Sequence, residues 1–180
     1  MTSSPQHWLA DSPEFRADRY YRYDDLTAML HRWAEHHTDL CAVESIGQTW
    51  QGRDIWAVTL TNRATGPDTE KPAAFVDANI HAGEVTGSAS VLWLIDHLLR
   101  GHGSDDAVTR MLDTSVLYAV PRINCDGSEA YLTSPAFMRS SMRPYPDEDQ
   151  QDGQPAIGDQ HRQHDVLRRR DRRQAHQDKK

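Results

Sequence analysis

The stretch that decides the fold is AAFVDANIHAGEVTGSASVLWLIDHLL, residues 73–99. Residues 73–80 form an apolar run of the kind found in central strands that are covered on both sides. Residues 85–99 carry apolar side chains at helical spacing, and Gly101 offers a stop for that helix. The polar turn HAGE, residues 81–84, separates the two segments. The stretch therefore predicts a strand, a turn and a helix, the repeating unit of an α/β protein.

Further elements are expected on either side of this unit. Residues 24–37 predict a first helix with acidic residues in its opening turn. Two β-like runs, 41–49 and 54–61, are joined by a hairpin connection that contains glycine. Residues 105–112 predict a short helix, and residues 115–121 a second central strand. Together these elements predict an α/β fold with a mixed sheet and helices on both of its faces.

The composition divides the chain sharply. Its 180 residues suit one domain plus tails. We expect an N-terminal extension over residues 1–19, a folded unit over 20–146 and a polar tail rich in Arg, His and Gln over 147–180. The tail has too few aliphatic residues to build a core, which predicts disorder. The net charge of -7 combines an acidic body with a basic tail and indicates no particular partner.

The compartment is inferred from what the sequence lacks. The opening residues, MTSSPQHWLADSPEF, have neither the basic nor the apolar region of a secretory signal, and no apolar stretch reaches the length of a membrane span. We therefore expect a cytoplasmic protein without membrane association. Cys41 and Cys125 are too few for a disulfide framework or a cysteine-based zinc site, and we interpret both as buried thiols. The sequence does not indicate the oligomeric state.

His81 and Glu84 are the candidate metal ligands. Ligands of α/β proteins collect at the carboxyl ends of the strands, and this pair directly follows residues 73–80. An imidazole nitrogen and a carboxylate oxygen that are separated by a turn containing Gly83 can converge on one Zn²⁺ ion. The alternative is a solvated loop histidine beside a glutamate that begins a helix.

Two further motifs accompany this pair. Residues 47–55, GQTWQGRDI, fall in the expected hairpin, and residues 122–127, RINCDG, follow the second central strand. In this order the three segments resemble the zinc metallocarboxypeptidase family related to carboxypeptidases A and B, with its G-x-S-x-E-G-R-like hairpin, H-x-x-E zinc pair and N-P-D-G turn. Cys125 replaces the usual proline of that turn. Three residues are interpreted as turn-formers rather than catalysts: Asn124, Asp126 and Gly127.

The resemblance covers residues 20–145 and implies an incomplete zinc-carboxypeptidase fold, with Zn²⁺ as the cofactor and peptides as substrates. His81 and Glu84 match two of the family's zinc ligands. Arg139, in the segment FMRSSMRPYP, matches the arginine that stabilises the tetrahedral oxyanion. Arg143 is a second candidate for that role, and a surface arginine in a loop is the alternative to both.

The resemblance also implies parts that the sequence does not supply. A complete member needs a second histidine ligand, an Asn-Arg pair for the substrate's terminal carboxylate and a glutamate as general base. The composition changes abruptly at Pro146, and we interpret the tail as the product of a reading-frame shift or premature end. His161, His164 and His176 would supply a ligand only if the tail became ordered. We therefore expect a truncated metallocarboxypeptidase that is weakly active or inactive, and its preferred C-terminal residue is not indicated.

Two other functions are compatible with parts of the sequence. A zinc-dependent deacylase of small acylated amino acids shares the H-x-x-E pair, although the hairpin and the FMRSSMRPYP segment fit peptidases better. A non-catalytic binding protein would use the basic tail to contact anionic partners. The tail lacks interleaved aromatic residues and its aspartates dilute its charge, so we expect no nucleic-acid partner.

Overall fold

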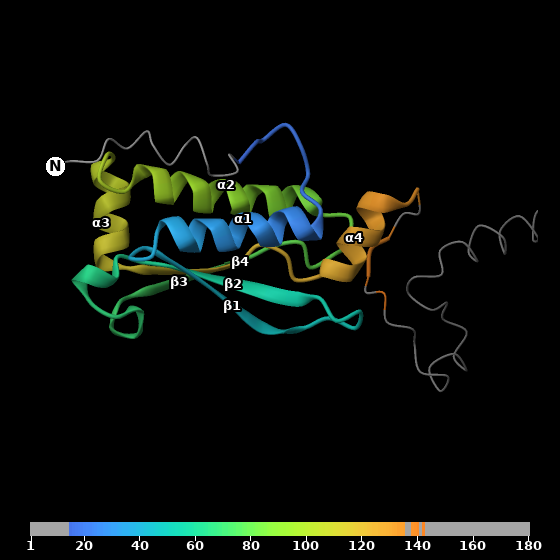
Figure 1. Ribbon diagram of the computed structural model, residues 1–180, viewed down its shortest axis with the longest axis horizontal. Coiled ribbons are helices and arrows are strands. Elements are labelled where there is room, and N and C mark those ends of the chain that lie inside the picture. Colours follow the sequence, from blue (N-terminus) through green and yellow to red (C-terminus); the bar gives the residue numbers. More distant parts are fainter. Residues whose placement is uncertain (1–14, 136–137, 141, 143–180) are drawn as a thin grey trace, which may run out of the picture.

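The computed structural model describes residues 15–135, 138–140 and 142. Residues 1–14 of the expected extension, Arg143 and the expected tail over 147–180 lie outside the described residues. The elements in chain order are α1 Tyr23–His36, β1 Cys41–Gln48, β2 Asp54–Leu60, η2 Arg63–Thr65, η3 Asp68–Glu70, β3 Ala73–Asp77, α2 Val85–Gly101, α3 Asp106–Thr114, β4 Val116–Val120 and α4 Cys125–Thr133 (Figure 1).

The four strands form one mixed sheet in the order β1-β2-β4-β3. The pairs β1–β2 and β2–β4 are antiparallel, whereas β3 and β4 are parallel and are connected through α2 and α3. This confirms the mixed α/β architecture that the sequence predicts. Because β3 and β4 are parallel neighbours, their carboxyl ends lie at the same edge of the sheet, where the α/β rule places ligands.

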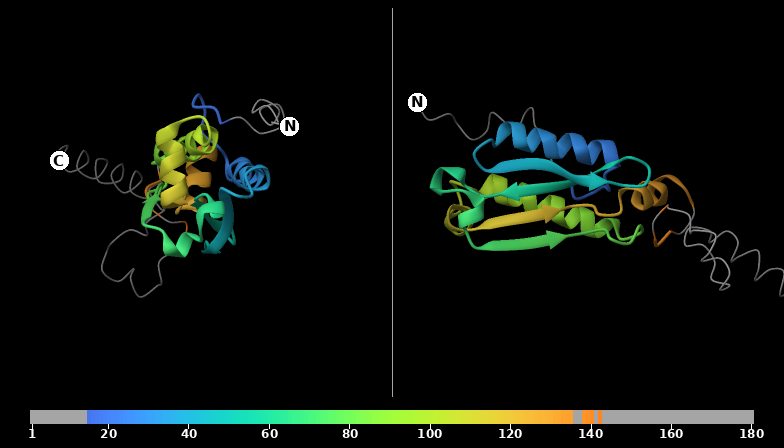
Figure 2. Two further views of the ribbon diagram at one scale, coloured as in Figure 1. Left: turned by 90° about the vertical axis from the view of Figure 1, so that its left-hand side faces the viewer. Right: turned by 90° about the horizontal axis from the view of Figure 1, so that it is seen from below.

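The helices α1 and α2 lie side by side against one face of the sheet (Figure 1). Their shared core consists of buried side chains from both helices and from the inner strands, among them Leu30, Trp33, Val58, Leu60, Leu92, Ile95, Leu117 and Ala119. The second view of Figure 2 shows the opposite face, and no described helix crosses its strands. Within the described residues, the helices therefore cover one face, whereas the sequence predicts helices on both.

The strand β3 differs from its expected environment. It lies at the edge of the described sheet, and Phe75 at its centre is 66% exposed. Apolar composition indicates a strand but does not reveal which neighbours cover it, so the prediction of a doubly covered central strand over 73–80 is wrong for the part of the chain that is described. The prediction of a central strand over residues 115–121 is confirmed, because β4 has a neighbour on each side and four of its five residues are buried.

Two local features depart from the sequence prediction. β3 ends at Asp77 because Asn79 adopts the left-handed conformation, with φ of 58°, which strand geometry does not allow. The helix α4 was not expected, since its first residues were interpreted as turn-formers. Oδ1 of Asn124 accepts a hydrogen bond from the backbone N–H of Gly127, which caps the helix at its N-terminus.

Two other expectations concern cysteines and membranes. Cys41 and Cys125 are both buried free thiols, as the sequence predicts. None of the helices in the described residues is both long enough and apolar enough to span a membrane.

Candidate metal centre

His81 and Glu84 lie where the sheet's parallel strands end. His81 occupies the turn that follows β3, and Glu84 is the N-cap residue of α2. The Glu84 side chain makes no capping hydrogen bond. Its carboxylate instead faces His81, and Nδ1 of His81 lies 2.9 Å from Oε1 of Glu84. Both side chains are partly exposed, His81 by 38% and Glu84 by 53%, so an ion from solvent can reach the two donor atoms.

Arg139 contacts the other nitrogen of the same ring. Its Nη2 lies 3.2 Å from Nε2 of His81. A guanidinium group can only donate, so Nε2 must be the acceptor and the neutral imidazole must carry its proton on Nδ1. That proton is donated to the carboxylate of Glu84. The histidine thus links the carboxylate to the guanidinium.

The two donor atoms suit zinc in chemistry and spacing. Imidazole nitrogen and carboxylate oxygen are both zinc ligands, and two ligand atoms of a tetrahedral site lie roughly 3.3 Å apart. Nδ1 of His81 and Oε1 of Glu84 lie 2.9 Å apart, so the two atoms would need to move only slightly apart for a metal to take the place of the proton between them. Among the residues that the structure describes, no group of three His, Cys, Asp or Glu side chains could hold a metal. The described residues therefore offer two candidate ligands, fewer than a zinc site needs.

Hydrogen bonds from α4 and the 138–140 segment fix the backbone around this pair. Nδ2 of Asn124 donates to the carbonyl of Ile80, at 3.3 Å, and to that of Ser140, at 3.1 Å. The backbone N–H of Ala82 donates to the carbonyl of Arg139, at 2.8 Å. Asn124 therefore joins the segment carrying His81 to the segment carrying Arg139.

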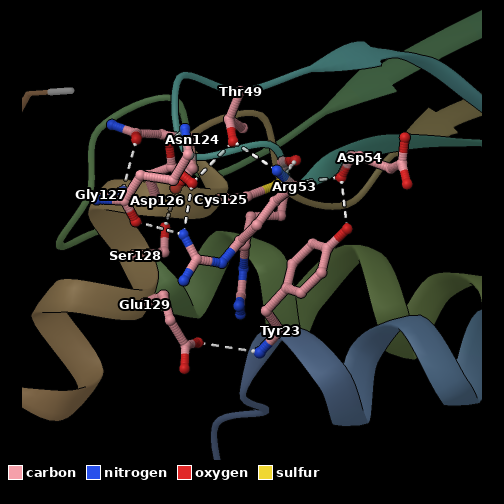
Figure 3. Close-up of polar contacts among 12 residues, drawn as sticks. Tyr23, Thr49, Arg53, Asp54, Asn124, Cys125, Asp126, Gly127, Ser128 and Glu129 are labelled. Carbon is pink, nitrogen blue, oxygen red and sulfur yellow. Dashed lines mark hydrogen bonds and ion pairs between the residues drawn. The ribbon is translucent and has the colours of Figure 1, made fainter. Parts of the chain in front are cut away.

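A charged clamp holds the tip of the β1–β2 hairpin against α4 (Figure 3). Asp126, whose side chain is only 5% exposed, accepts from Nη1 of Arg53 at 2.6 Å. It also accepts from the Thr49 hydroxyl at 2.8 Å and from the backbone N–H of Gln51 at 2.9 Å. The guanidinium of Arg53 lies over the ring of Tyr23, 5.8 Å from its centroid. These contacts place the hairpin tip near His81, with which Thr49 and Trp50 share a pocket wall.

An open pocket of about 420 Å³ lies between the hairpin tip and His81. His81 forms part of its wall, and most of the remaining wall is apolar, including Trp50, Ile55, Ile80, Ile123 and Met142. Cys125 is the residue after Asn124 of this wall, but it does not line the pocket. Burial raises the pKa of its thiol to about 11, so the thiol stays neutral and unreactive. The pocket therefore connects His81 to an apolar surface.

The structure brings together the three residues that the sequence singled out. His81, Glu84 and Arg139 form one chain of contacts. Sequence reasoning missed the roles of Asn124 and Asp126. Both belong to the RINCDG motif. The opposite charges of Asp126 and of Arg53, which lies in the GQTWQGRDI motif, could have indicated that the two motifs meet.

Comparison with known proteins gives a consistent picture. The profile of a family described as "Zinc carboxypeptidase" matches residues 26–176. Mouse carboxypeptidase M is 28% identical over 112 residues, which cover 62% of this chain and 25% of that protein. Human carboxypeptidase A6 is 29% identical over 122 residues, covering 68% of this chain and 27% of that protein. The chain thus spans about a quarter of the length of these two relatives.

Solved structures share the fold. Thrombin activatable fibrinolysis inhibitor matches with a TM-score of 0.66 and 19% identity, over 72% of this chain and 31% of that chain. Carboxypeptidase A from Helicoverpa armigera matches with a TM-score of 0.64 and 19% identity, over 78% of this chain and 34% of that chain. At these identities the likeness establishes the fold alone. The matched part covers about a third of each of those two chains.

Proposed function

The chain belongs to the zinc carboxypeptidase family, and we propose that it carries the zinc-binding part of a metallocarboxypeptidase, which removes C-terminal residues from peptides. Zinc is the metal of that family and peptides are its substrates. The observation that carries the proposal is the 2.9 Å contact between Nδ1 of His81 and Oε1 of Glu84 at the carboxyl edge of β3 and β4.

His81 and Glu84 are proposed to hold the metal through Nδ1 and the carboxylate. A bound zinc ion would polarise the scissile carbonyl and lower the pKa of a water molecule. Arg139 is proposed to donate hydrogen bonds to the oxygen on which negative charge develops, because its guanidinium lies beside His81 and carries only donor groups. Binding of the metal through Nδ1 would place the ring proton of His81 on Nε2.

The isolated chain is proposed to bind zinc weakly and to hydrolyse peptides slowly or not at all. Two ligands give a zinc site less affinity and a less defined geometry than three do. The described residues place no third ligand beside His81 and Glu84. A general base would be needed to accept the proton of the attacking water. The prediction that residues 147–180 result from a reading-frame change stays open, and sequencing the coding DNA from Pro146 onward would test it.

Titration of the 180-residue chain with zinc against a chromophoric chelator tests the proposal. We expect His81→Ala to reduce the zinc affinity at least tenfold, whereas His97→Ala, which removes an exposed histidine of α2, should leave it unchanged. Equal affinities for all three proteins would refute the metal site. Release of the C-terminal residue from an N-blocked dipeptide should be slow, and fast release that His81→Ala abolishes would refute the weak-activity proposal while supporting the peptidase.

The relatives support a peptidase over a deacylase, since they are carboxypeptidases by name. The binding-protein alternative depends on the tail, which lies outside the described residues. A cytoplasmic location also stays a prediction, and fractionation of cells with an antibody against the chain would test it.

A further inference from the structure

Asn79 has an unusual backbone for its residue type. Among the described residues it is the only non-glycine residue with positive φ, at 58°. Its side chain is also buried, with an exposed fraction of 3%, so its polar atoms need partners within the protein. Asparagine adopts the left-handed region more readily than most residues, but glycine does so at lower cost. The presence of a side chain at this position therefore needs a reason of its own.

The side chain of Asn79 is fully engaged with the turn that carries the metal pair. Its Nδ2 donates to the carbonyl of His81 at 2.7 Å and to the carbonyl of Ala82 at 3.3 Å. Its Oδ1 accepts from the hydroxyl of Ser128 in α4 at 2.9 Å. A glycine would supply the same backbone conformation but none of these three contacts.

These contacts determine the shape of the turn between the two proposed ligands. The carbonyls of His81 and Ala82 belong to consecutive peptide units within the His81–Glu84 turn. When one amide group binds both carbonyls, it fixes the orientation of these units and hence the direction in which the two ligand side chains leave the backbone. The α4 side is equally tight, because a Cβ at Gly127 would lie 2.8 Å from Cβ of Ala82. The turn is thus held between Asn79 and α4.

We propose that Asn79 is a positioning residue for the metal pair: its buried amide holds the His81–Glu84 turn in the shape that lets both donor atoms bind one zinc ion. The inference rests on the proposed function, because it assigns Asn79 a role in zinc binding. Ser128 supports Asn79 by fixing its amide, so the hydrogen bonds run from α4 through Asn79 to the turn. Some residues hold a metal ligand in its orientation without contacting the metal themselves. Removing such a residue lowers metal affinity about tenfold to a hundredfold.

The test compares Asn79→Gly with the wild type in the 180-residue chain. Glycine retains the left-handed backbone and removes only the amide. We expect the zinc affinity, measured against a chromophoric chelator with each protein shown by circular dichroism to be folded, to fall about tenfold or more. We also expect the visible absorption of the cobalt-loaded protein, which reports ligand geometry, to change. Ser128→Ala should weaken zinc binding less, in the same direction, and it carries the test if Asn79→Gly does not fold.

A matched control separates positioning from general destabilisation. The buried hydroxyl of Thr61 donates to the carbonyls of Leu112 and Ser115, near the start of β4 and therefore at the end of the sheet away from His81. Thr61→Val should lower stability and leave the zinc affinity and the cobalt spectrum unchanged.

Three outcomes are distinguishable. Zinc binding by the wild type that is no stronger than that of His81→Ala would refute the proposed function and this inference with it. Wild-type binding that exceeds that of His81→Ala, together with unchanged affinity and spectrum in Asn79→Gly, would refute the positioning role alone. A loss in Asn79→Gly that Thr61→Val does not share supports it.

Discussion

Nη2 of Arg139 lies 3.2 Å from Nε2 of His81, while Glu84 contacts the opposite nitrogen of the same ring. A neutral histidine that binds zinc through Nδ1 carries its proton on Nε2 and can no longer accept a hydrogen bond there. Zinc and Arg139 therefore compete for His81. Metal binding should release the guanidinium, which is then available to a substrate.

Substitution of Arg139 tests this competition. Arg139→Ala removes the competing donor and a positive charge, while the backbone carbonyl of residue 139 can still bind the N–H of Ala82. We expect zinc affinity to increase about twofold to tenfold, the effect of losing one hydrogen bond, in a chelator competition at neutral pH. Arg110→Ala, on α3, serves as the charge control and should have no effect. Weaker zinc binding by Arg139→Ala would show that the two contacts do not exclude each other.

The sequence predicted the proximity of His81 and Glu84 better than the contacts around them. This pair could be found because side chains that are three residues apart across one turn meet without any knowledge of the tertiary structure. The contact between Arg139 and His81 could only be suggested by resemblance, since it joins segments 58 residues apart. The left-handed backbone of Asn79 was missed because the apolar run over 73–80, in which it lies, predicted a continuous strand.

The fold shows the same contrast between local patterns, which the sequence reveals, and contacts between distant segments, which it does not. The amphipathic pattern of residues 24–37 and 85–99 was sufficient to predict α1 and α2, whose apolar faces are buried against the sheet. An apolar strand, in contrast, does not specify its neighbours, and β3 was expected at the centre but lies at the described edge. The helix α4 was missed because Asn and Asp favour both turns and helix N-termini for the same reason, their acceptance of backbone N–H groups.

The Arg53–Asp126 clamp should contribute strongly to stability. Asp126→Ala leaves the guanidinium of Arg53, which is 28% exposed, without its carboxylate partner and also frees the N–H of Gln51. We expect a loss of about 3 kcal/mol in the free energy of unfolding by urea and faster amide exchange at Gln51. Asp18→Ala, which removes exposed ion pairs with Arg16 and Arg19, should not shift the urea midpoint. A similar small effect of both substitutions would mean that the clamp is not a stabilising contact.

Two glycines near the metal pair should respond to alanine in opposite directions. A Cβ at Gly127 would lie 2.6 Å from Oδ1 of Asn124 and 2.8 Å from the carbonyl of Ser140, so Gly127→Ala should cost about 2 kcal/mol or more. A Cβ at Gly87, within α2, would meet Cβ of Ala78 at an ordinary 3.5 Å, so Gly87→Ala should stabilise the protein by about 0.5–1 kcal/mol. Thermal unfolding of both variants checks the signs, and destabilisation by Gly87→Ala would contradict the packing described around α2.

The contact between α1 and α4 should make stability depend on pH. Burial alone would raise the pKa of Glu129, but hydrogen bonds from the Arg22 guanidinium and the backbone N–H of Tyr23 outweigh it and lower the pKa below its ordinary 4.5. The unfolded state therefore binds a proton at higher pH than the folded state does. The stabilisation is complete above about pH 5 and is lost as the pH falls through 4.5 toward the lower pKa of the folded state.

Glu129→Gln tests this linkage because it removes the titrating group and keeps its size. We expect the variant to be less stable than the wild type at neutral pH, and the difference between the two to shrink as the pH falls below 4.5. Urea unfolding at a series of pH values measures it. Glu35→Gln, at an exposed position of α1, should instead give a curve parallel to that of the wild type. If the Glu129→Gln curve were also parallel, the ion pair between Arg22 and Glu129 would contribute nothing to the acid sensitivity of the fold, and the α1–α4 contact would depend on packing alone.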